Sequence, residues 1–327
     1  MKILFTCVGR RVELMQAFHC AAERLGIDLT IIGADITRSA PALQFCDKTE
    51  IICRISDENY IPMLLSICAR EKVDCLIPTI DTDLLLLAKN KNSFEQIGTK
   101  VLISNPEKVK LCRDKNYTAD YFISLGLKSP RPFNSVKKYE DELNSGKQSF
   151  PAFIKPKDGS SSINAYRVDS LEDLKLYAEK IGDYIIQPFV SGKEYTIDIF
   201  CDYEGNPVYI TPRERMAVRA GEVLKTRIAQ DEVMIGEMKT LIADYKPCGQ
   251  ITVQLIQDEN TGDNYYIEIN PRFGGGAPLS IKAGADSAEA VLKMLNGEEI
   301  IYHHKAARDG AIYCRFDQSV CVNEDEV

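Results

Sequence analysis

The sequence predicts a mixed chain, with a parallel α/β domain at its start and an α+β region after it. Two apolar strand-like runs, residues 2–8 and 29–34, flank a segment with helical apolar spacing, residues 11–25. Strand–helix–strand units of this kind build parallel sheets. From about residue 105 the pattern changes, and strand-like runs joined by short turns predict hairpins.

The composition is that of an ordinary soluble protein with two or three domains, since 327 residues carry 45% hydrophobic and 27% charged side chains. A net charge of −8 argues against broad binding to nucleic acid or to an anionic membrane. No apolar run approaches the roughly 20 residues of a membrane span. Gly9-Arg10-Arg11 interrupts the first apolar run too early for a signal peptide, so a cytoplasmic protein is expected.

The eleven cysteines are scattered through the chain without a Cys-x-x-Cys pair. This usage predicts reduced thiols in a cytosolic protein rather than disulfides or a zinc site. Only three histidines occur, at His19, His303 and His304, which weakens any hypothesis of zinc or histidine catalysis.

The first third of the chain continues the α/β pattern. Gly26 lies where the first helix should stop, and the first turn lacks Gly-x-Gly-x-x-Gly, which argues against a dinucleotide site. The next strands are expected at 48–53, 75–78 and 100–104, and the helices between them at 58–71 and 82–90. Asp81 and Asp83 follow a strand at the edge where open parallel sheets bind ligands. Each is expected either to touch substrate or to cap the next helix.

The rest of the chain alternates short helices with hairpin strands. Helices are expected at 106–111, 117–125 and 171–181, and a surface helix or loop at 137–149. Strands are expected at 152–157, 166–168, 184–189, 194–201, 207–212 and 250–257. The acidic end, residues 323–326, is expected to be a loose tail.

The run 267–278, Ile-Glu-Ile-Asn-Pro-Arg-Phe-Gly-Gly-Gly-Ala-Pro, is a strand that ends in a glycine turn. Strand alternation places Glu268 and Asn270 on one face, and a hairpin would align Gln254 with Glu268. Three such oxygen ligands suit a hard cation, and Arg272 would meet the phosphate that the cation holds. The alternative is a strand edge with a solvated acid.

A second motif combines a lysine on a strand with a loop of small residues. Lys155 and Lys157 precede Gly159, Ser160, Ser161 and Ser162. Backbone N–H groups and hydroxyls of such a loop can fold over a polyphosphate, and a lysine can add a point charge. The loop is not a Walker motif. A surface hairpin with a solvated lysine is the alternative.

A third motif is an apolar strand with a free edge. Main-chain groups of Gln187, Pro188, Phe189 and Val190 can pair with an adenine ring, and Glu194 can accept from ribose hydroxyls. Pro188 cannot donate, so Phe189 or Val190 must supply any N–H to the base.

In order and spacing, these motifs together with Lys115 resemble the ATP-grasp superfamily. The likeness is to stand-alone proteins similar to one synthetase half of the carbamoyl-phosphate synthase large subunit. It implies a pre-ATP-grasp α/β domain followed by a two-lobed ATP-grasp fold. The implied boundaries are 1–105 for the first domain, 106–190 for the N-terminal lobe, 191–300 for the C-terminal lobe and 301–327 for an extension and tail.

The resemblance implies a role for each matching residue. Lys115 and Lys155 would bind the ATP phosphates, with Lys157 beside them and residues 159–162 as a lid. Residues 187–190 would bind adenine and Glu194 the ribose. Gln254, Glu268 and Asn270 would hold two Mg²⁺ ions, for which Mn²⁺ could substitute, and Arg272 would steady an acyl-phosphate. Gln187-Pro188 stands where the family commonly has an acidic pair, which leaves the partner of the adenine amino group open.

The substrate side of the site is less defined. Arg213, Arg215 and Arg219 are candidates for a substrate carboxylate, because guanidinium groups bind carboxylates through two parallel hydrogen bonds. Surface pairing with Glu214 and Glu222 is the alternative. Three consecutive glycines, including Gly274 and Gly275, would let backbone approach the substrate closely. The turn at Gly9-Arg10-Arg11 could contribute as well.

The predicted activity is that of an ATP-dependent carboxylate–amine ligase acting on small molecules through an acyl-phosphate. The chain holds one grasp unit, which argues against complete carbamoyl-phosphate synthesis or biotin carboxylation. Two alternatives stay open: a small-molecule kinase of the same fold and an ATP-binding regulatory module without turnover. A homodimer is also left open, and neither nucleic acid nor membrane is expected as a partner.

Overall fold

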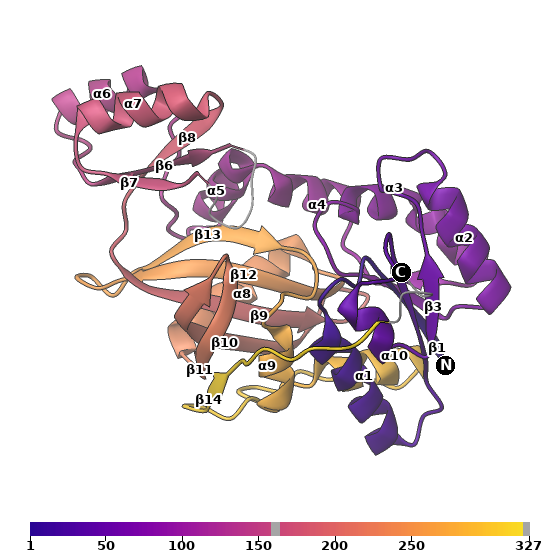
Figure 1. The fold of residues 1–327 in the computed structure, drawn as a ribbon. Coiled ribbons are helices and arrows are strands. Elements are labelled where there is room, and N and C mark those ends of the chain that lie inside the picture. Colours follow the sequence, from indigo (N-terminus) through magenta and orange to yellow (C-terminus); the bar gives the residue numbers. More distant parts are fainter. Residues whose placement is uncertain (158–163, 323–327) are drawn as a thin grey trace.

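The computed structural model describes residues 1–157 and 164–322, which form three sheets with helices packed around them (Figure 1). The N-terminal sheet is parallel and has the order β3-β2-β1-β4-β5. Its strands are β1 (Lys2–Thr6), β2 (Thr30–Asp35), β3 (Lys48–Ile51), β4 (Cys75–Pro78) and β5 (Lys100–Val101). Its helices are α1 (Val12–Leu25), the short η1 (Pro41–Phe45), α2 (Tyr60–Glu71) and α3 (Leu84–Gln96). The predicted parallel α/β domain is confirmed.

Helix α1 shows how the local sequence sets this domain. Its buried side chains recur at helical spacing and include Leu14, Met15 and Phe18. The helix ends at Gly26, whose φ of 65° lies in the left-handed region that glycine adopts without strain. The predicted stop is therefore confirmed.

A small lobe follows, built on a three-stranded antiparallel sheet of order β7-β6-β8. Its elements are α6 (Val136–Asn144), β6 (Ala152–Pro156), β7 (Tyr166–Val168), α7 (Leu171–Ile181) and β8 (Tyr184–Pro188). This lobe has its own hydrophobic core, which includes Tyr139, Ile154 and Leu174. It stands apart from the rest of the molecule at the upper left of Figure 1. The predicted hairpin is the β6–β7 pair.

The largest sheet is antiparallel and has six strands in the order β13-β12-β9-β10-β11-β14. Its strands are β9 (Gly192–Cys201), β10 (Pro207–Arg219), β11 (Glu222–Ile228), β12 (Gly249–Asp258), β13 (Asn264–Asn270) and β14 (Ile312–Cys314). The helices nearby are α4 (Pro106–Arg113), α5 (Lys115–Ser124), α8 (Glu232–Tyr245), α9 (Ala277–Lys282) and α10 (Ser287–Leu295). The sequence did not predict β11, β14, α8, α9 or α10, and β10 extends well past its expected end at residue 212.

Helix α5 packs on the six-stranded sheet rather than on the small lobe, and the buried Val109 of α4 belongs to a core of the N-terminal domain. Phe122 and Leu127 belong to the same hydrophobic core as Ile197 and Tyr266. The Phe122 and Tyr266 rings lie 5.3 Å apart. The compact small lobe therefore begins after residue 128, whereas the lobe boundary at residue 106 stays a prediction.

The N-terminal domain and the six-stranded sheet share a core. The Phe18 ring of α1 packs edge to face against Phe5 of β1 and against Phe273, just after β13. The ring centroids are 5.0 Å and 6.0 Å apart, respectively. Ala288 and Val291 of α10 complete this cluster. The shared core fixes the carboxyl ends of the parallel strands against the end of β13.

All eleven cysteines are free. Among the helices of residues 1–157 and 164–322, none combines the length and the apolar character needed to cross a membrane.

Candidate active site

The three predicted metal ligands come together on one hairpin. Gln254 of β12 lies directly opposite Glu268 of β13, and a register shift follows at Leu255. Asn270 lies two residues further along β13, and its Nδ2 donates a hydrogen bond to Glu268 Oε1 at 2.9 Å. Cross-strand pairing and strand alternation therefore produce the expected cluster.

This donor set suits magnesium. Only Glu268 is a carboxylate, and the side-chain oxygens of Gln254 and Asn270 are neutral. Mg²⁺ commonly takes one or two protein carboxylates and completes its octahedron with phosphate oxygens and water. Among the described residues no group of three His, Cys, Asp or Glu side chains is placed to hold a metal. An ion at this hairpin would therefore depend on nucleotide phosphates for several of its ligands.

Arg272 links the hairpin to the N-terminal domain. Its Nη2 donates to Asp81 Oδ2 at 2.7 Å, and its side chain is only 13% exposed. Its Nε is buried without a hydrogen-bond partner among the described residues. A buried N–H without an acceptor is costly, so this atom is suited to an anionic ligand.

The two aspartates after β4 lie in different environments. Asp81 lies at the candidate site through its pair with Arg272. Asp83 precedes α3 but makes no side-chain cap bond. It is fully buried and accepts from Thr6 Oγ1 at 2.8 Å and Tyr60 OH at 3.0 Å, and burial raises its pKa to about 6. Asp83 thus occupies the expected N-cap position of α3, but its carboxylate bonds to β1 and α2 and so ties these elements to α3.

The two predicted phosphate-binding lysines lie on different elements near each other. Lys155 projects from β6, and Lys115 begins α5, where its Nζ donates to the Lys157 carbonyl at 3.1 Å. Burial lowers the pKa of Lys155 to about 8, Glu268 opposes this shift and the Lys115 charge adds to it. Lys155 thus lies within electrostatic reach of both Lys115 and Glu268. Gly159, Ser160, Ser161 and Ser162 lie outside the described residues.

The predicted adenine segment runs from the end of β8 into the connection to β9. The Gln187 side chain is buried and its Nε2 donates to the Pro130 carbonyl at 2.7 Å. The Phe189 N–H donates to the Pro151 carbonyl at 3.2 Å, so it is already engaged. Of the two N–H groups expected for the base, Val190 is therefore the better candidate. Pro188 is the last residue of β8.

The ribose candidate Glu194 is half-exposed on β9. Its Oε2 accepts from Arg215 Nε at 3.2 Å. Arg215 also donates from Nη1 to Thr196 Oγ1 at 3.3 Å, and burial lowers its pKa. Arg215 therefore orients Glu194, while the other Glu194 oxygen stays accessible to a hydroxyl.

The other two candidate arginines differ sharply. Arg219 is exposed and forms a surface ion pair, as the alternative predicted, but its partner is Asp317 rather than Glu214 or Glu222. Arg213 is 1% exposed and its Nε donates to Asp198 Oδ2 at 2.8 Å. Its Nη1 is buried without a partner among the described residues. Of the three, Arg213 has the donor best suited to a substrate carboxylate.

Sequence reasoning missed Asp198 and considered Glu222 only as a surface partner of the arginines. Asp198 accepts from Arg213, from Thr252 Oγ1 at 3.1 Å and from Ser280 Oγ at 2.6 Å. The signal was an aspartate inside the apolar strand Tyr-Thr-Ile-Asp-Ile-Phe, at a position where a charge needs partners.

The glycine triplet after β13 lies against these charged side chains. A Cβ on Gly274 would stand 2.8 Å from Thr252 Oγ1, and one on Gly276 would stand 2.5 Å from Arg213 Nη2. A Cβ on Gly275 would collide with the Glu222 carboxylate and come within 2.8 Å of Arg11 Nη1. At each of the three positions a side chain would force its neighbour to shift, while the approach of this backbone to a substrate stays a prediction.

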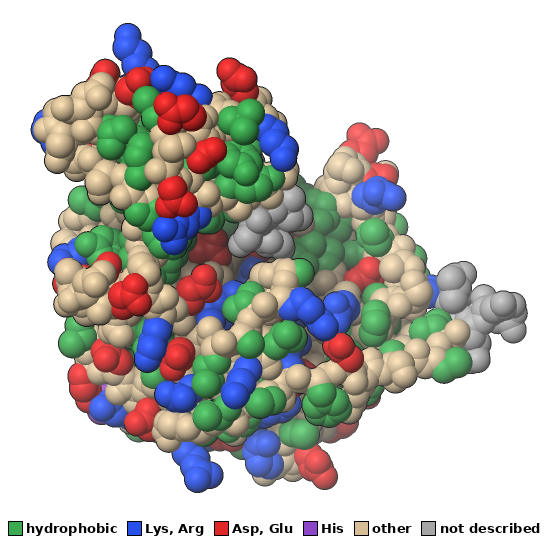
Figure 2. All heavy atoms as spheres, turned by 60° about the vertical axis from the view of Figure 1, so that its left-hand side comes forward, with side chains coloured by type: hydrophobic (Ala, Val, Ile, Leu, Met, Phe, Trp, Pro, Cys, Tyr) green, Lys and Arg blue, Asp and Glu red, His purple; other side chains and the backbone are tan. Residues whose placement is uncertain are grey.

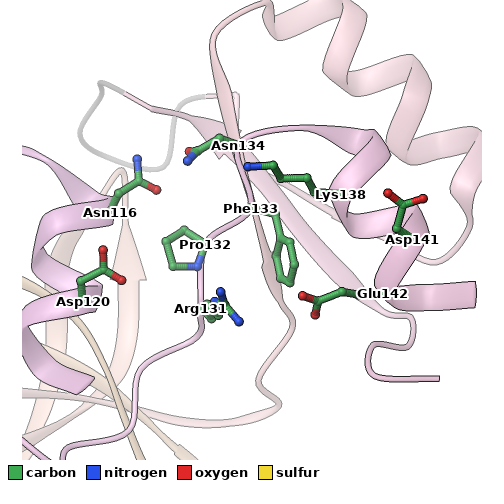
Figure 3. Close-up of a pocket in the computed structure, with 9 residues that line it drawn as sticks. All are labelled: Asn116, Asp120, Arg131, Pro132, Phe133, Asn134, Lys138, Asp141 and Glu142. Atoms are coloured by element: carbon green, nitrogen blue, oxygen red, sulfur yellow. The ribbon is translucent and has the colours of Figure 1, made fainter. Parts of the chain in front are cut away.

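The molecular surface is hollowed between the small lobe and the body of the molecule (Figure 2). A separate groove of about 430 Å³ lies beside residues 131–134, between α5 and α6 (Figure 3). Its lining residues are Asn116, Asp120, Arg131, Pro132, Phe133, Asn134, Lys138, Asp141 and Glu142. None of the predicted ligand-binding residues lines this groove, so it is distinct from the candidate site.

Two family descriptions match the chain. Residues 3–102 match the PylC-like N-terminal domain, and residues 180–313 match ATP-grasp in the biosynthetic pathway with Ter operon. The first match covers the parallel domain. The second covers the six-stranded sheet with the Gln254–Glu268 pair and Arg272.

Curated relatives cover overlapping parts. A carbamoyl-phosphate synthase of Methanobrevibacter smithii is 28% identical over 215 residues, which are 65% of this chain and 55% of that protein. A D-alanine–D-alanine ligase of Francisella tularensis subsp. tularensis is 32% identical over 195 residues, 55% of this chain and 64% of that protein. The chain thus spans between about half and two thirds of the length of these relatives.

Solved structures show the same fold. The biotin carboxylase domain of Hydrogenobacter thermophilus 2-oxoglutarate carboxylase, a dimer in complex with MgADP, ADP and bicarbonate, superposes with a TM-score of 0.71. The match covers 96% of this chain and 74% of that chain at 18% identity. The ATP-grasp match over residues 180–313 and the PylC-like match over residues 3–102 together make the chain similar to one synthetase unit of the carbamoyl-phosphate synthase large chain.

Proposed function

We propose that the protein is an ATP-dependent ligase that activates a small carboxylate as an acyl-phosphate and transfers the acyl group to an amine. The convergence of Gln254, Glu268 and Asn270 with Lys155 and Arg272 carries this proposal. Lys155 comes from the small lobe and the other four from the six-stranded sheet and the segment after β13, an arrangement that supports a nucleoside triphosphate bound between them. The ligase and synthase names of the relatives support the same reaction class.

The nucleotide would be held by groups of both lobes. Val190 would donate its N–H to the adenine ring and Glu194 would accept from the ribose. Lys155 and Lys115 would neutralise phosphate charge, and Gln254, Glu268 and Asn270 would hold magnesium against the phosphates. When bound, magnesium would offset the charge on the transferring phosphoryl group.

The carboxylate substrate would be oriented by arginines that have donors without protein acceptors. Arg213 Nη1 and Arg272 Nε are both buried and unpartnered among the described residues. A carboxylate oxygen attacks the γ-phosphorus, the bond to ADP breaks, and the acyl-phosphate carries new negative charge beside Arg272. The amine then attacks the acyl carbon, the bond to the phosphate oxygen breaks, and phosphate leaves. Guanidinium groups stabilise both anions because their charge is fixed.

Glu268→Gln tests the assignment. The variant keeps the shape of the strand but removes the only carboxylate of the metal set, so magnesium-dependent ADP formation should be abolished while circular dichroism and the melting temperature stay near those of the parent. Glu179→Gln on the exposed face of α7 is the matched control and should retain full activity.

The assay uses magnesium, ATP and a panel of small carboxylates and amines, and it measures ADP and phosphate. A ligase needs both substrates for ADP release. Release with a single acceptor would instead favour a kinase, and normal turnover of the Glu268→Gln variant would refute the site.

A further inference from the structure

Arg11 and Glu222 face each other across Gly275, although they lie far apart in the sequence. Arg11 precedes α1 in the N-terminal domain, and Glu222 is the first residue of β11 in the six-stranded sheet. Both side chains occupy the space that a Cβ on Gly275 would enter. The two domains therefore place opposite charges on either side of the glycine triplet.

Arg11 has unused capacity for an anion. Its Nη2 donates to the Thr79 carbonyl at 3.2 Å, and its Nη1 is 4.0 Å from Glu222 Oε1, which is too far for a hydrogen bond. The side chain is 20% exposed, and burial together with the neighbouring Arg272 charge lowers its pKa. An arginine still stays protonated, so a guanidinium in this setting attracts a carboxylate.

Glu222 has the complementary capacity for a cation. Its Oε2 accepts from Arg315 Nη1 at 3.1 Å, whereas Oε1 has no hydrogen-bond donor among the described residues. Its side chain is 51% exposed. Arg315 also donates from Nε to Glu13 Oε2 at 3.0 Å, so the segment after β14 holds Glu222 in place.

The geometry points to an α-amino acid as the amine substrate: we propose that Arg11 binds its carboxylate and Glu222 its amino group. This inference rests on the proposed function and specifies the substrate class. The carboxylate and ammonium of an amino acid would lie alongside the Arg11–Glu222 pair with opposite polarity, so that each charge meets its counterpart. Gly275 allows this approach because a side chain there would push the two groups apart.

A purely structural ion pair is a poor account of this arrangement. At 4.0 Å and with Glu222 half-exposed, the pair contributes little to stability. Recognition of a ligand accounts better for two opposite charges that are held on either side of Gly275 without a hydrogen bond between them.

The test measures binding rather than turnover. Thermal shift and calorimetry are carried out with magnesium and a non-hydrolysable ATP analogue, against the L- and D-forms of the common α-amino acids. Each acid is compared with its amide, which lacks the carboxylate charge, and with the amine left by decarboxylation. At least one amino acid should bind, and its amide should bind about 10- to 100-fold more weakly, as expected for loss of a charge-assisted pair.

The variants separate recognition from folding. Arg11→Gln should weaken the amino acid by about 10- to 100-fold yet leave the affinity of the amide unchanged, because the amide makes no ion pair with Arg11. Glu222→Gln should weaken acid and amide alike, since both keep the ammonium. Gly275→Ala should weaken both, whereas Gly236→Ala in α8, where a Cβ meets nothing within 4 Å, should change neither.

The inference is wrong if no amino acid binds, if acid and amide bind equally, or if Arg11→Gln weakens both to the same extent. Amino-acid binding that depends on Arg11 but occurs without any ADP formation would support the binding assignment of Arg11 and Glu222 and remove the proposed ligase activity. ADP formation with amines that lack a carboxylate, at rates unaffected by Arg11→Gln, would support the ligase activity and contradict the amino-acid inference.

Discussion

Lys155 is the residue whose charge state depends most on its surroundings. Burial opposes the charged ammonium, and the nearby Lys115 adds to this effect, so the pKa falls from 10.5 to about 8. The lysine is thus still mostly charged at neutral pH, but its pKa lies only slightly above that pH. Bound phosphates would restore its usual preference for the charged form.

The first prediction concerns ATP affinity and pH. Because the folded protein loses the Lys155 proton near pH 8, ATP affinity should fall about tenfold between pH 7 and pH 9. Calorimetric titration of the protein with magnesium and a non-hydrolysable ATP analogue measures this. Lys155→Arg keeps its charge over the whole range and should show no such decline; an equal decline in that variant would rule out Lys155 as its source.

The lowered pKa of Lys155 also makes the stability of the folded protein depend on pH. The folded pKa lies below the unfolded value, so burial of the ammonium destabilises the protein below about pH 8. This penalty is relieved as the pH rises from about 8 toward 10.5.

At the residue scale, the sequence predicted clusters that depend on local periodicity. Strand alternation joins Glu268 to Asn270, and a short turn pairs Gln254 with Glu268, so both contacts follow from nearby residues. The acceptor of Arg213 did not follow, because Asp198 lies on a neighbouring strand whose register the sequence does not specify. Glu222 was considered only as a surface partner, since the packing of β11 beside Gly275 depends on the complete sheet.

Among the elements, β9 is the one that organises the sheet around the site. Its Asp198 accepts hydrogen bonds from β10 through Arg213, from β12 through Thr252 and from α9 through Ser280. A single buried carboxylate therefore joins three strands and a helix. It also fixes the Arg213 guanidinium beside Gly276.

The second prediction follows from this junction. Asp198→Asn should lower the free energy of unfolding by about 3–5 kcal/mol, because it leaves the Arg213 charge buried without its counterion. Thr252→Val removes only one neutral donor and should cost about 1 kcal/mol. Urea denaturation compares them, and equal losses would show that the ion pair does not dominate this junction.

The elements that the sequence missed have physical reasons for being missed. β14 has only three residues at the edge of the sheet and gains its conformation from pairing with β11. α9 follows three glycines and has a proline in its first turn, a pattern that resembles a loop. β10 runs on through charged residues to Arg219 because β11 supplies a ladder partner.

At the scale of the whole molecule, the small lobe is joined to the body by two connections and packs around a core of its own. Lys155 belongs to this lobe, whereas Glu268 and Arg272 belong to the body. Ligand binding between them should therefore change the position of the lobe as well as its stability.

The third prediction is that magnesium and ATP together close the lobe. The radius of gyration from X-ray scattering should decrease, and amides of β6 and β8 should exchange more slowly. At a ligand concentration about 100 times the dissociation constant, binding should stabilise the fold by about 2.7 kcal/mol. ATP with a chelator is the control and should produce less of each effect; unchanged scattering with the complete ligand would argue for a rigid cleft.

The shared core of α1, α10 and the end of β13 limits how this protein can be recombined with its relatives. Phe18 contacts Phe273 across the boundary, so a cut near residue 105 separates the sequence without separating the hydrophobic core. In a chimera whose first hundred residues come from a relative, the side chain at the position of Phe18 would no longer match Phe273. An exchange that also carries residues 273–295 would keep the native aromatic contacts. The segment that must be exchanged as a unit is therefore discontinuous in sequence.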